Sequence, residues 1–351
     1  MPVDEEKLMG YVHQAVGDFG SILTGALVNI GDKLGLFNAL AGAGPTTPAD
    51  LAKTTGTTER YVREWASGLA AAGYVDYAGD GKYELNEEQS IAFTDESSPA
   101  FIIGGFQAML AATGIVPKAV DAFRTGDGIG WHEHNPDLFQ GTERFFRPGY
   151  AANLVQSWIP ALDGADAKLS SGAKVADVGC GFGASTIIMA QAYPNSQFWG
   201  FDYHEPSIRH AQDAAAEAGV SDRTTFEVAA AKEYPGDHYD LVCHFDCLHD
   251  MGDPIGAADY TRRSLKDDGH WLLVEPFAND DVADNLNPIG RVFYSASTLI
   301  CTPASLSQEV GKGLGAQAGE SRLREVAEAA GFTSFRRATE TPFNLVLEGR
   351  P

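Results

Sequence analysis

The stretch Lys174-Val-Ala-Asp-Val-Gly-Cys-Gly-Phe-Gly-Ala-Ser185 decides how this chain of 351 residues folds. Its first five residues are mostly apolar and predict a short buried strand. Gly179, Gly181 and Gly183 follow at once, and residues 184–192 then have the pattern of a helix. Glycines let a ligand approach the backbone closely, and free N–H groups at a helix start attract acceptor or anionic groups. This order of elements therefore predicts a nucleotide-type binding site.

The glycine spacing fits more than one cofactor. Gly179-x-Gly181-x-x-Ala184 matches the dinucleotide fingerprint, which is a weak pattern. Asp177 lies two residues before the first glycine, which gives D-x-G-x-G-x-G. A second predicted strand, residues 197–202, ends in Asp202, whose carboxylate can accept hydrogen bonds from both ribose hydroxyls, as NAD enzymes also require. These residues alone leave the cofactor open.

Composition narrows the class of protein. The net charge of −23 argues against nucleic acid as substrate or partner, because phosphate contacts dominate that affinity. No run of apolar residues reaches the roughly 18 of a membrane span, and the acidic N-terminus lacks a signal-peptide pattern. The four cysteines form no disulfide framework. We therefore expect a reduced, cytoplasmic protein without membrane partners.

The N-terminal part is predicted to be mainly helical. Residues 8–40 have apolar side chains at helical spacing. Residues 37–95 then predict a winged helix: a helix capped by Thr47, a second helix from Thr57 with a capping signal, and a β-hairpin over 73–85. This segment carries four basic and nine acidic side chains, so we expect a structural or dimerising role and no DNA binding. Residues 98–160 are again helical and rich in aromatic side chains, most of them in the core and a few lining an apolar pocket.

From residue 173 onward strands and helices alternate, which predicts an α/β fold with a parallel sheet covered on both faces. The last two strands, 334–338 and 343–348, are joined by a short turn and must therefore pair antiparallel. The predicted strands lie at 173–178, 197–202, 224–229, 239–245 and 270–275, and the predicted helices at 184–192, 205–218, 254–266 and 319–330.

With these features the chain resembles the class I S-adenosylmethionine-dependent methyltransferases (EC 2.1.1.-), whose Rossmann-like sheet is mostly parallel and ends in an antiparallel strand. The winged helix in front makes it similar to the two-domain O-methyltransferases, in particular to bacterial winged-helix methyltransferases. The resemblance implies a helical, winged-helix domain over residues 1–160, which dimerises and roofs the substrate, and a cofactor-binding domain over 161–351.

The resemblance implies S-adenosylmethionine as cofactor and assigns roles to matching positions. The glycine turn, with Asp177 and Cys180, would surround the methionine part. Asp202 would hold the ribose hydroxyls, and Tyr203 would lie beside the adenine. The remaining cofactor positions are Ala231 and Lys232 after the third strand, and Phe245 and Asp246 at the end of the fourth.

The family comparison also places a catalytic base. In two-domain O-methyltransferases a His-Asp pair follows the fourth strand, and its histidine takes the proton of the acceptor hydroxyl. His249-Asp250 matches that position, and Glu275 at the end of the fifth strand is a candidate to orient His249. Met251 departs from the tryptophan of the plant-type enzymes. The alternative is that Leu-His-Asp only forms a turn.

No metal site is predicted. Cys243, His244, Cys247 and His249 crowd together, but alternate residues of a strand face opposite ways and cannot converge. The loop Trp131-His-Glu-His134 could bind a metal or contact substrate. We name Trp131 and His132 as substrate candidates.

The segment from Phe277 to Gly319 is long for a connection between a strand and a helix, and such loops are often functional. It contains a helix start after Asn287, and it leaves the carboxyl end of a strand, where ligands bind in open α/β sheets. Arg291 and Tyr294 are therefore further substrate candidates.

These observations favour a homodimeric methyltransferase that acts on a small apolar or aromatic metabolite, most readily at oxygen. Two alternatives remain open at this point. One is a regulator that binds S-adenosylmethionine without turnover, and the other is an NAD-dependent oxidoreductase, against which Asp177 and the C-terminal hairpin argue.

Overall fold

The computed structural model describes residues 3–351, which form two compact units. Unit 1 consists of Met1–Leu110 and Gln140–Pro148, and unit 2 of Ala111–Phe139 and Gly149–Pro351. The chain therefore enters unit 2, returns to unit 1 for one stretch of helix, and finishes in unit 2. The functional division expected near residue 160 stays a prediction.

Unit 1 contains the predicted winged helix. Thr47 is the N-cap of the first helix of this motif and accepts a hydrogen bond from Asp50 N at 3.2 Å, with Pro48 in the first turn. The capping signal expected for the next helix is wrong: Thr58 precedes that helix but makes no side-chain capping bond. The elements are α1 (Glu5–Lys33), α2 (Leu36–Leu40), α3 (Pro48–Thr55), α4 (Glu59–Ala71), the antiparallel strands β1 (Asp76–Gly79) and β2 (Lys82–Glu84), α5 (Glu87–Thr94) and α6 (Ile103–Thr113).

Aromatic side chains form the core of unit 1. Phe37 stacks on Phe93 with ring centroids 4.8 Å apart and meets Trp65 edge-on at 5.2 Å. The indole N–H of Trp65 donates to Leu27 O at 2.9 Å and so ties α4 to α1. Gly31 makes this close approach possible, because a β-carbon there would lie 2.7 Å from both Phe37 and Trp65.

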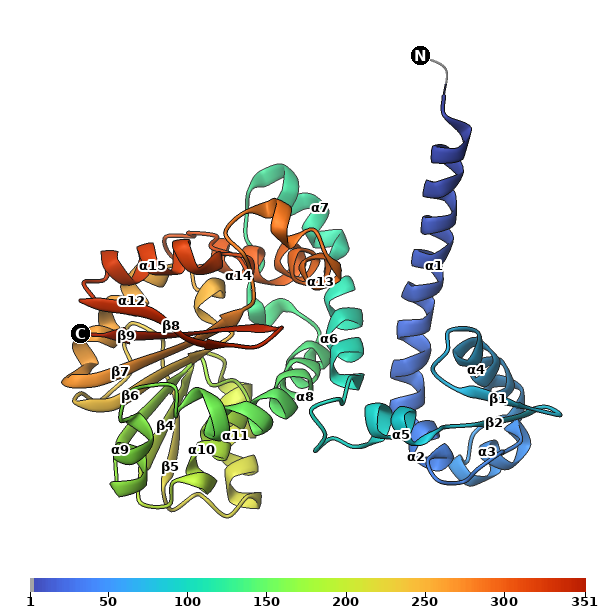
Figure 1. Ribbon diagram of the computed structural model, residues 1–351, viewed down its shortest axis with the longest axis horizontal. Helices are drawn as coiled ribbons and strands as arrows, with labels where there is room; N and C mark the ends of the chain where they lie inside the picture. Colours follow the sequence, from blue (N-terminus) through green and yellow to red (C-terminus); the bar gives the residue numbers. More distant parts are fainter. Residues whose placement is uncertain (1–2) are drawn as a thin grey trace. The chain divides into compact units, whose positions relative to one another are not determined.

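Unit 2 is built on one seven-stranded sheet in the order β5-β4-β3-β6-β7-β9-β8 (Figure 1). All neighbours are parallel except β9, which runs antiparallel to both β7 and β8. The predicted parallel alternation and the reversed C-terminal strand are thus confirmed. The largest boundary error is at β7: α12 ends at Ser264, and β7 begins at Leu265 instead of residue 270. The other predicted ends of the strands and helices in this unit differ from the structure by at most two residues. The strands are β3 (Lys174–Val178), β4 (Gln197–Asp202), β5 (Thr224–Val228), β6 (Tyr239–Phe245), β7 (Leu265–Pro276), β8 (Ser334–Glu340) and β9 (Asn344–Arg350).

Helices cover both faces of this sheet (Figure 1). As a result β6, in the middle of the sheet, is buried along its whole length, as expected for a central parallel strand. One face carries α9 (Ala165–Ser171), α10 (Ala184–Ala192) and α11 (Glu205–Glu217), and the other carries α12 (Pro254–Ser264) and α15 (Gly319–Ala329).

The long connection after β7 is itself mostly helical. Asn287 caps its main helix by accepting a hydrogen bond from Gly290 N at 2.9 Å, which confirms the predicted start. The connection comprises η4 (Val282–Asn285), α13 (Pro288–Ala296), η5 (Ser297–Cys301) and α14 (Thr302–Leu306). The other elements are α7 (Val116–Thr125), η1 (Trp131–Glu133), α8 (Pro136–Asn153), η2 (Leu154–Trp158) and η3 (Leu248–Asp250).

Within residues 3–351 no single helix is long and apolar enough to cross a membrane. The consecutive helices α6 and α7, bent by 57°, pass that test only as a pair.

Candidate functional site

The glycine turn between β3 and α10 has the backbone that its sequence predicts. Gly179, Gly181 and Gly183 have φ angles of 77°, 53° and 81°, in the left-handed region that favours glycine. The turn is anchored because Gly179 N and Cys180 N both donate to Phe201 O, at 2.8 and 3.0 Å. A β-carbon on Gly181 would meet no atom within 4 Å, so the middle of the turn faces open space.

Asp177 is buried below this turn. Its Oδ2 accepts hydrogen bonds from the hydroxyls of Ser185 and Thr186, both at 2.6 Å. Its Oδ1 is buried and has no hydrogen-bond partner among the described residues. Burial raises the pKa of Asp177 to about 6, against the opposing effect of the two hydroxyls. The carboxylate thus keeps one acceptor atom unused beside the turn.

Asp202 ends β4 and braces the same turn. Its two carboxylate oxygens accept hydrogen bonds from Gly181 N at 3.0 Å and His204 N at 2.8 Å. Burial raises the pKa of Asp202, although these two N–H donors lower it. Tyr203, the next residue, is 46% exposed. Asp202, the predicted ribose residue, therefore lies directly beside the glycine turn.

The other predicted cofactor residues differ in their surroundings. Ala231 packs against the main core of unit 2, whereas the ammonium group of Lys232 pairs with Asp253 at 2.9 Å. Phe245 packs on Tyr150 with ring centroids 5.5 Å apart.

Asp246 is held in an unusual backbone conformation, with a φ of 50°. Its carboxylate accepts hydrogen bonds from Tyr150 Oη at 2.8 Å and Asn344 Nδ2 at 3.2 Å. Burial is the main cause that raises the pKa of Asp246 to about 7. The two residues that hold Asp246 come from α8 and β9, and the sequence offered no signal for either.

The predicted base and its orienting residue are in contact. Nδ1 of His249 lies 2.5 Å from Oε2 of Glu275, and the other oxygen of Glu275 accepts from Leu248 N at 3.0 Å. Both side chains are buried. Burial alone lowers the pKa of His249, but the carboxylates of Glu275 and Asp250 raise it well above its ordinary value. The two carboxylates thus favour the protonated form of the imidazole.

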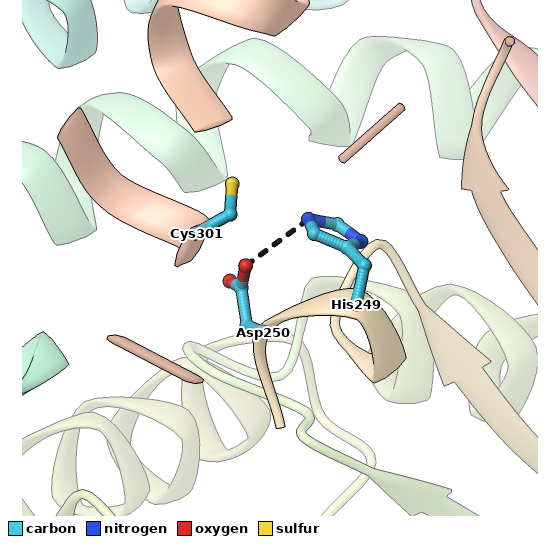
Figure 2. Close-up of side chains that lie close together, drawn as sticks. All are labelled: His249, Asp250 and Cys301. Atoms are coloured by element: carbon cyan, nitrogen blue, oxygen red, sulfur yellow. Dashed lines mark ion pairs between the residues drawn. The ribbon is translucent and has the colours of Figure 1, made fainter. Parts of the chain in front are cut away.

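A third residue joins this pair from a distant part of the chain. Nε2 of His249 forms an ion pair with Oδ1 of Asp250 at 3.1 Å, and the thiol of Cys301 lies beside both (Figure 2). Burial raises the pKa of Cys301 to about 12. Sequence reasoning missed Cys301, because it follows the pair by some fifty residues and belongs to no recognisable motif.

The loop with the substrate candidates Trp131 and His132 packs against the long connection. Ile129 N donates to Pro303 O at 2.9 Å, and Leu299 packs on Ile129 and its neighbours. Trp131 lies against Phe139 with ring centroids 5.2 Å apart, whereas His132 is exposed.

His134, in the same loop, is buried, and neither of its ring nitrogens has a hydrogen-bond partner within residues 3–351. Burial lowers the pKa of His134, and the nearby carboxylates of Glu133 and Asp250 oppose this. The loop thus lies near the His249–Asp250 pair.

The remaining substrate candidates are on α13. Arg291 is exposed and Tyr294 is half-buried. Their part in substrate binding stays a prediction.

Comparison with known proteins identifies the two parts of the chain. Residues 169–325 match the family described as a methyltransferase domain, and residues 23–95 match the Rv2258c-like winged HTH domain. The 27-O-demethylrifamycin SV methyltransferase of Amycolatopsis mediterranei is 31% identical over 154 residues, which cover 42% of this chain and 48% of that protein. The chain therefore spans about half the length of the curated relatives it matches.

Solved structures of the same fold cover the chain almost completely. PigF, solved with SAH, has a TM-score of 0.74 at 19% identity and covers 100% of both chains. Human N-acetylserotonin methyltransferase, solved in complex with SAM, has a TM-score of 0.70 at 18% identity and covers 97% of both chains. At these identities the likeness concerns the fold.

The methyltransferase match decides against the NAD-dependent oxidoreductase that the glycine spacing left open, and it confirms the expected class and cofactor. The chain thus carries an Rv2258c-like winged HTH domain over residues 23–95 and a methyltransferase domain over residues 169–325.

Proposed function

We propose that this protein transfers the methyl group of S-adenosylmethionine to an oxygen of a small apolar or aromatic metabolite in the cytoplasm. One observation carries the proposal: His249, which contacts Glu275, directly follows the segment that packs on the glycine turn. A β-carbon on Gly179 would lie 2.7 Å from Sγ of Cys247, two residues before His249. An acceptor held at His249 would thus be close to the cofactor.

The residues of this chain fit S-adenosylmethionine. The open space over Gly181 and the unpartnered Oδ1 of Asp177 are suited to the methionine part. Asp202 would bind the ribose hydroxyls, and the half-exposed Tyr203 would cover the adenine. When bound, the cofactor supplies an electrophilic methyl group.

The chemistry left to the protein is orientation and proton removal. Placing acceptor and methyl group in line supplies much of the rate. A hydroxyl acceptor must also lose its proton, and His249, oriented by Glu275, would take it. Oxygen as the methylated atom agrees with the relative whose name specifies it, the 27-O-demethylrifamycin SV methyltransferase. Trp131 and Phe139 offer the aromatic surface that an apolar acceptor requires.

We further propose that the protein is a homodimer joined through its N-terminal helices. Apolar side chains on α1 support this: Ile22 and Leu23 are 66% and 68% exposed.

The winged-helix match supports a second candidate function, that of a regulator that binds the cofactor without turnover. The excess of acidic over basic side chains in residues 37–95 argues against contact with DNA phosphates. Mobility-shift assays at low salt with genomic fragments would detect such binding, and we expect none.

The main test compares His249→Gln with the wild type. Calorimetric titration with S-adenosylhomocysteine and with NAD first establishes the cofactor site. Transfer of a tritiated methyl group to a panel of phenolic and other hydroxylated metabolites then measures turnover. We expect His249→Gln to lower turnover by about 10²–10⁴-fold with nearly unchanged affinity for S-adenosylhomocysteine. Full turnover by this variant would remove His249 from the mechanism.

A further inference from the structure

Three potential metal ligands converge at the His249 site. Nε2 of His249, Oδ1 of Asp250 and Sγ of Cys301 all lie within 4.8 Å of one another. Figure 2 shows the three side chains pointing toward a common space, two of them from η3 and Cys301 from the end of η5. Ligands 2.0–2.3 Å from a tetrahedral ion lie roughly 3.5 Å apart, so the cluster would contract by little more than about 1 Å on binding.

From this arrangement we propose that His249, Asp250 and Cys301 bind a soft divalent transition-metal ion of the Zn²⁺ class. An imidazole, a carboxylate and a thiolate are the ligand types that zinc combines in proteins. The sulfur ligand disfavours Mg²⁺ and Ca²⁺, which prefer oxygen alone. Three protein ligands leave one coordination position open.

The hydrogen bond between Nδ1 of His249 and the carboxylate of Glu275 is of the kind that metal-binding histidines usually make. Glu275 accepts from Nδ1, which directs Nε2 toward Asp250 and Cys301. In metal sites such a carboxylate sets the tautomer and the ring orientation of the ligand. Glu275 is itself held by Leu248 N, so the ring is oriented before any ion binds.

The charge of the site also suits a divalent ion. Oδ1 of Asp250 is buried and, among the described residues, lacks a hydrogen-bond donor of acceptable geometry. With Cys301 ionised by the metal, the three ligands carry two negative charges, which one divalent cation neutralises. Metal binding therefore releases the proton of the thiol.

Hydrogen bonds hold the two contributing segments together. Gln308 spans them: its Nε2 donates to Asp250 O at 3.0 Å, and its Oε1 accepts from Gly252 N at 3.0 Å. Ser305 Oγ donates to Met251 O at 2.8 Å. Cys301 is thus positioned against the His-Asp pair by several contacts of its own segment, as a preorganised site requires.

This inference rests on the proposed function in one respect. A bound ion occupies the lone pair of Nε2 that His249 needs to accept a proton. Metal binding and proton removal by His249 therefore exclude one another, and Zn²⁺ is expected to inhibit methyl transfer.

Cobalt(II) is the probe for the site, because it enters zinc sites and reports sulfur ligation by a thiolate charge-transfer absorption. The full-length protein is freed of metal with a chelator, kept reduced with a phosphine, and titrated with Co²⁺. We expect the charge-transfer absorption to saturate at one equivalent and to be displaced by Zn²⁺. Absence of this absorption from the wild type overturns the proposal.

Matched cysteine variants locate the ligand. Cys301→Ala should abolish the charge-transfer absorption, whereas Cys243→Ala, which removes another buried thiol, should retain it. Glu275→Gln should retain the absorption but weaken Co²⁺ binding about 10–100-fold. Absorption that persists in Cys301→Ala refutes the site. If Cys301→Ala does not fold, an unchanged Co²⁺ affinity in His249→Gln refutes the site instead.

Calorimetry with S-adenosylhomocysteine on the metal-free protein separates this proposal from the proposed function. Loss of cofactor binding with an intact cobalt spectrum would overturn the methyltransferase proposal and leave the metal site standing. Cofactor binding by a protein that shows no cobalt charge-transfer absorption would overturn the metal site and leave the methyltransferase proposal standing.

Discussion

Gly179 and Cys247 are in such close contact that Gly179 has no room for a side chain. A β-carbon on Gly179 would lie 2.7 Å from Sγ of Cys247 and 3.1 Å from its Cβ. The thiol of Cys247 in turn donates to Val178 O at 3.2 Å. The segment that follows β6 is thereby held against the glycine turn, and His249 lies two residues beyond this contact.

Gly179→Ala is expected to destabilise the protein and to weaken cofactor binding. The new methyl group meets Cys247, and alanine is strained at a φ of 77°. Strain of this kind costs about 1–3 kcal/mol. Thermal unfolding measures the loss of stability, and calorimetry with S-adenosylhomocysteine measures the loss of affinity.

Gly181→Ala is the matched control for steric contact. Its β-carbon would face open space, although the φ of 53° still disfavours alanine. We expect a smaller loss of stability than in Gly179→Ala, with a clear loss of affinity, because the methyl group occupies the proposed cofactor space. Normal affinity in Gly181→Ala would show that the cofactor binds elsewhere.

Asp177→Asn is expected to stabilise the unliganded protein at alkaline pH. The pKa of Asp177, about 6 when folded, exceeds the ordinary value of 3.8, so the folded state binds more protons than the unfolded state between these pH values. This carboxyl therefore makes the protein less stable as pH rises through 6. Asparagine removes that effect, and the gain in melting temperature should be larger at pH 8 than at pH 5.

Asp177→Asn should also bind S-adenosylhomocysteine about tenfold more weakly than the wild type, a change of roughly 1.4 kcal/mol in binding free energy. Asp163→Asn, at a side chain that is 98% exposed, is the control for loss of charge alone. If the melting temperature of Asp177→Asn fell below that of the wild type by the same amount at pH 5 and pH 8, the role assigned to the burial of Asp177 would be contradicted.

The sequence was sufficient to predict the sheet, the reversed C-terminal strand and the glycine turn. These features follow from local patterns: apolar runs, glycines at positive φ, and a turn too short for a parallel crossover. The contact of His249 with Glu275 could also be predicted, because adjacent parallel strands end at the same edge of a sheet. His249 lies just beyond the end of β6, Glu275 lies at the end of β7, and these two strands pair directly.

Cys301, Tyr150 and Asn344 could not be found in this way. Each comes from an element far along the chain from the residue it contacts, and none belongs to a motif. The positions of Cys301 and Tyr150 depend on how the long connection and α8 pack, and that of Asn344 depends on the pairing of β9 with β7, which are tertiary properties. The early end of α12 at Ser264 has a similar cause: Leu265 pairs with Tyr239 in the sheet, and this pairing overrides the helical pattern of the sequence.

His244 is expected to reduce stability in acid. It lies in the core on β6, where its Nδ1 accepts a hydrogen bond from the indole of Trp271 at 3.0 Å. Burial lowers the pKa of His244 to about 3. Between pH 6.5 and 3 the unfolded state therefore binds more protons than the folded one, and the stabilisation present above pH 6.5 is lost as pH falls, by about 1.4 kcal/mol for each pH unit.

His244→Asn tests this expectation, because its amide oxygen can accept the indole hydrogen bond but does not titrate. The melting temperature of the variant should decline less steeply than that of the wild type from pH 6.5 to 4.5. Parallel curves for the two proteins would show that other groups cause the acid instability.

Substitutions that place charged residues on the exposed apolar side of α1 are expected to dissociate the proposed dimer. Val12, Val16, Phe19 and Leu23 follow one another at helical spacing and are 45–68% exposed. A buried glutamate without a partner is costly, so Phe19→Glu with Leu23→Glu should shift the protein to monomers in sedimentation velocity. Gln14→Glu, an exposed position outside this stripe, should leave the sedimentation coefficient unchanged. If the double variant sediments as the wild type does, either the dimer forms through another surface or the protein is a monomer, and the mass from sedimentation equilibrium decides between the two.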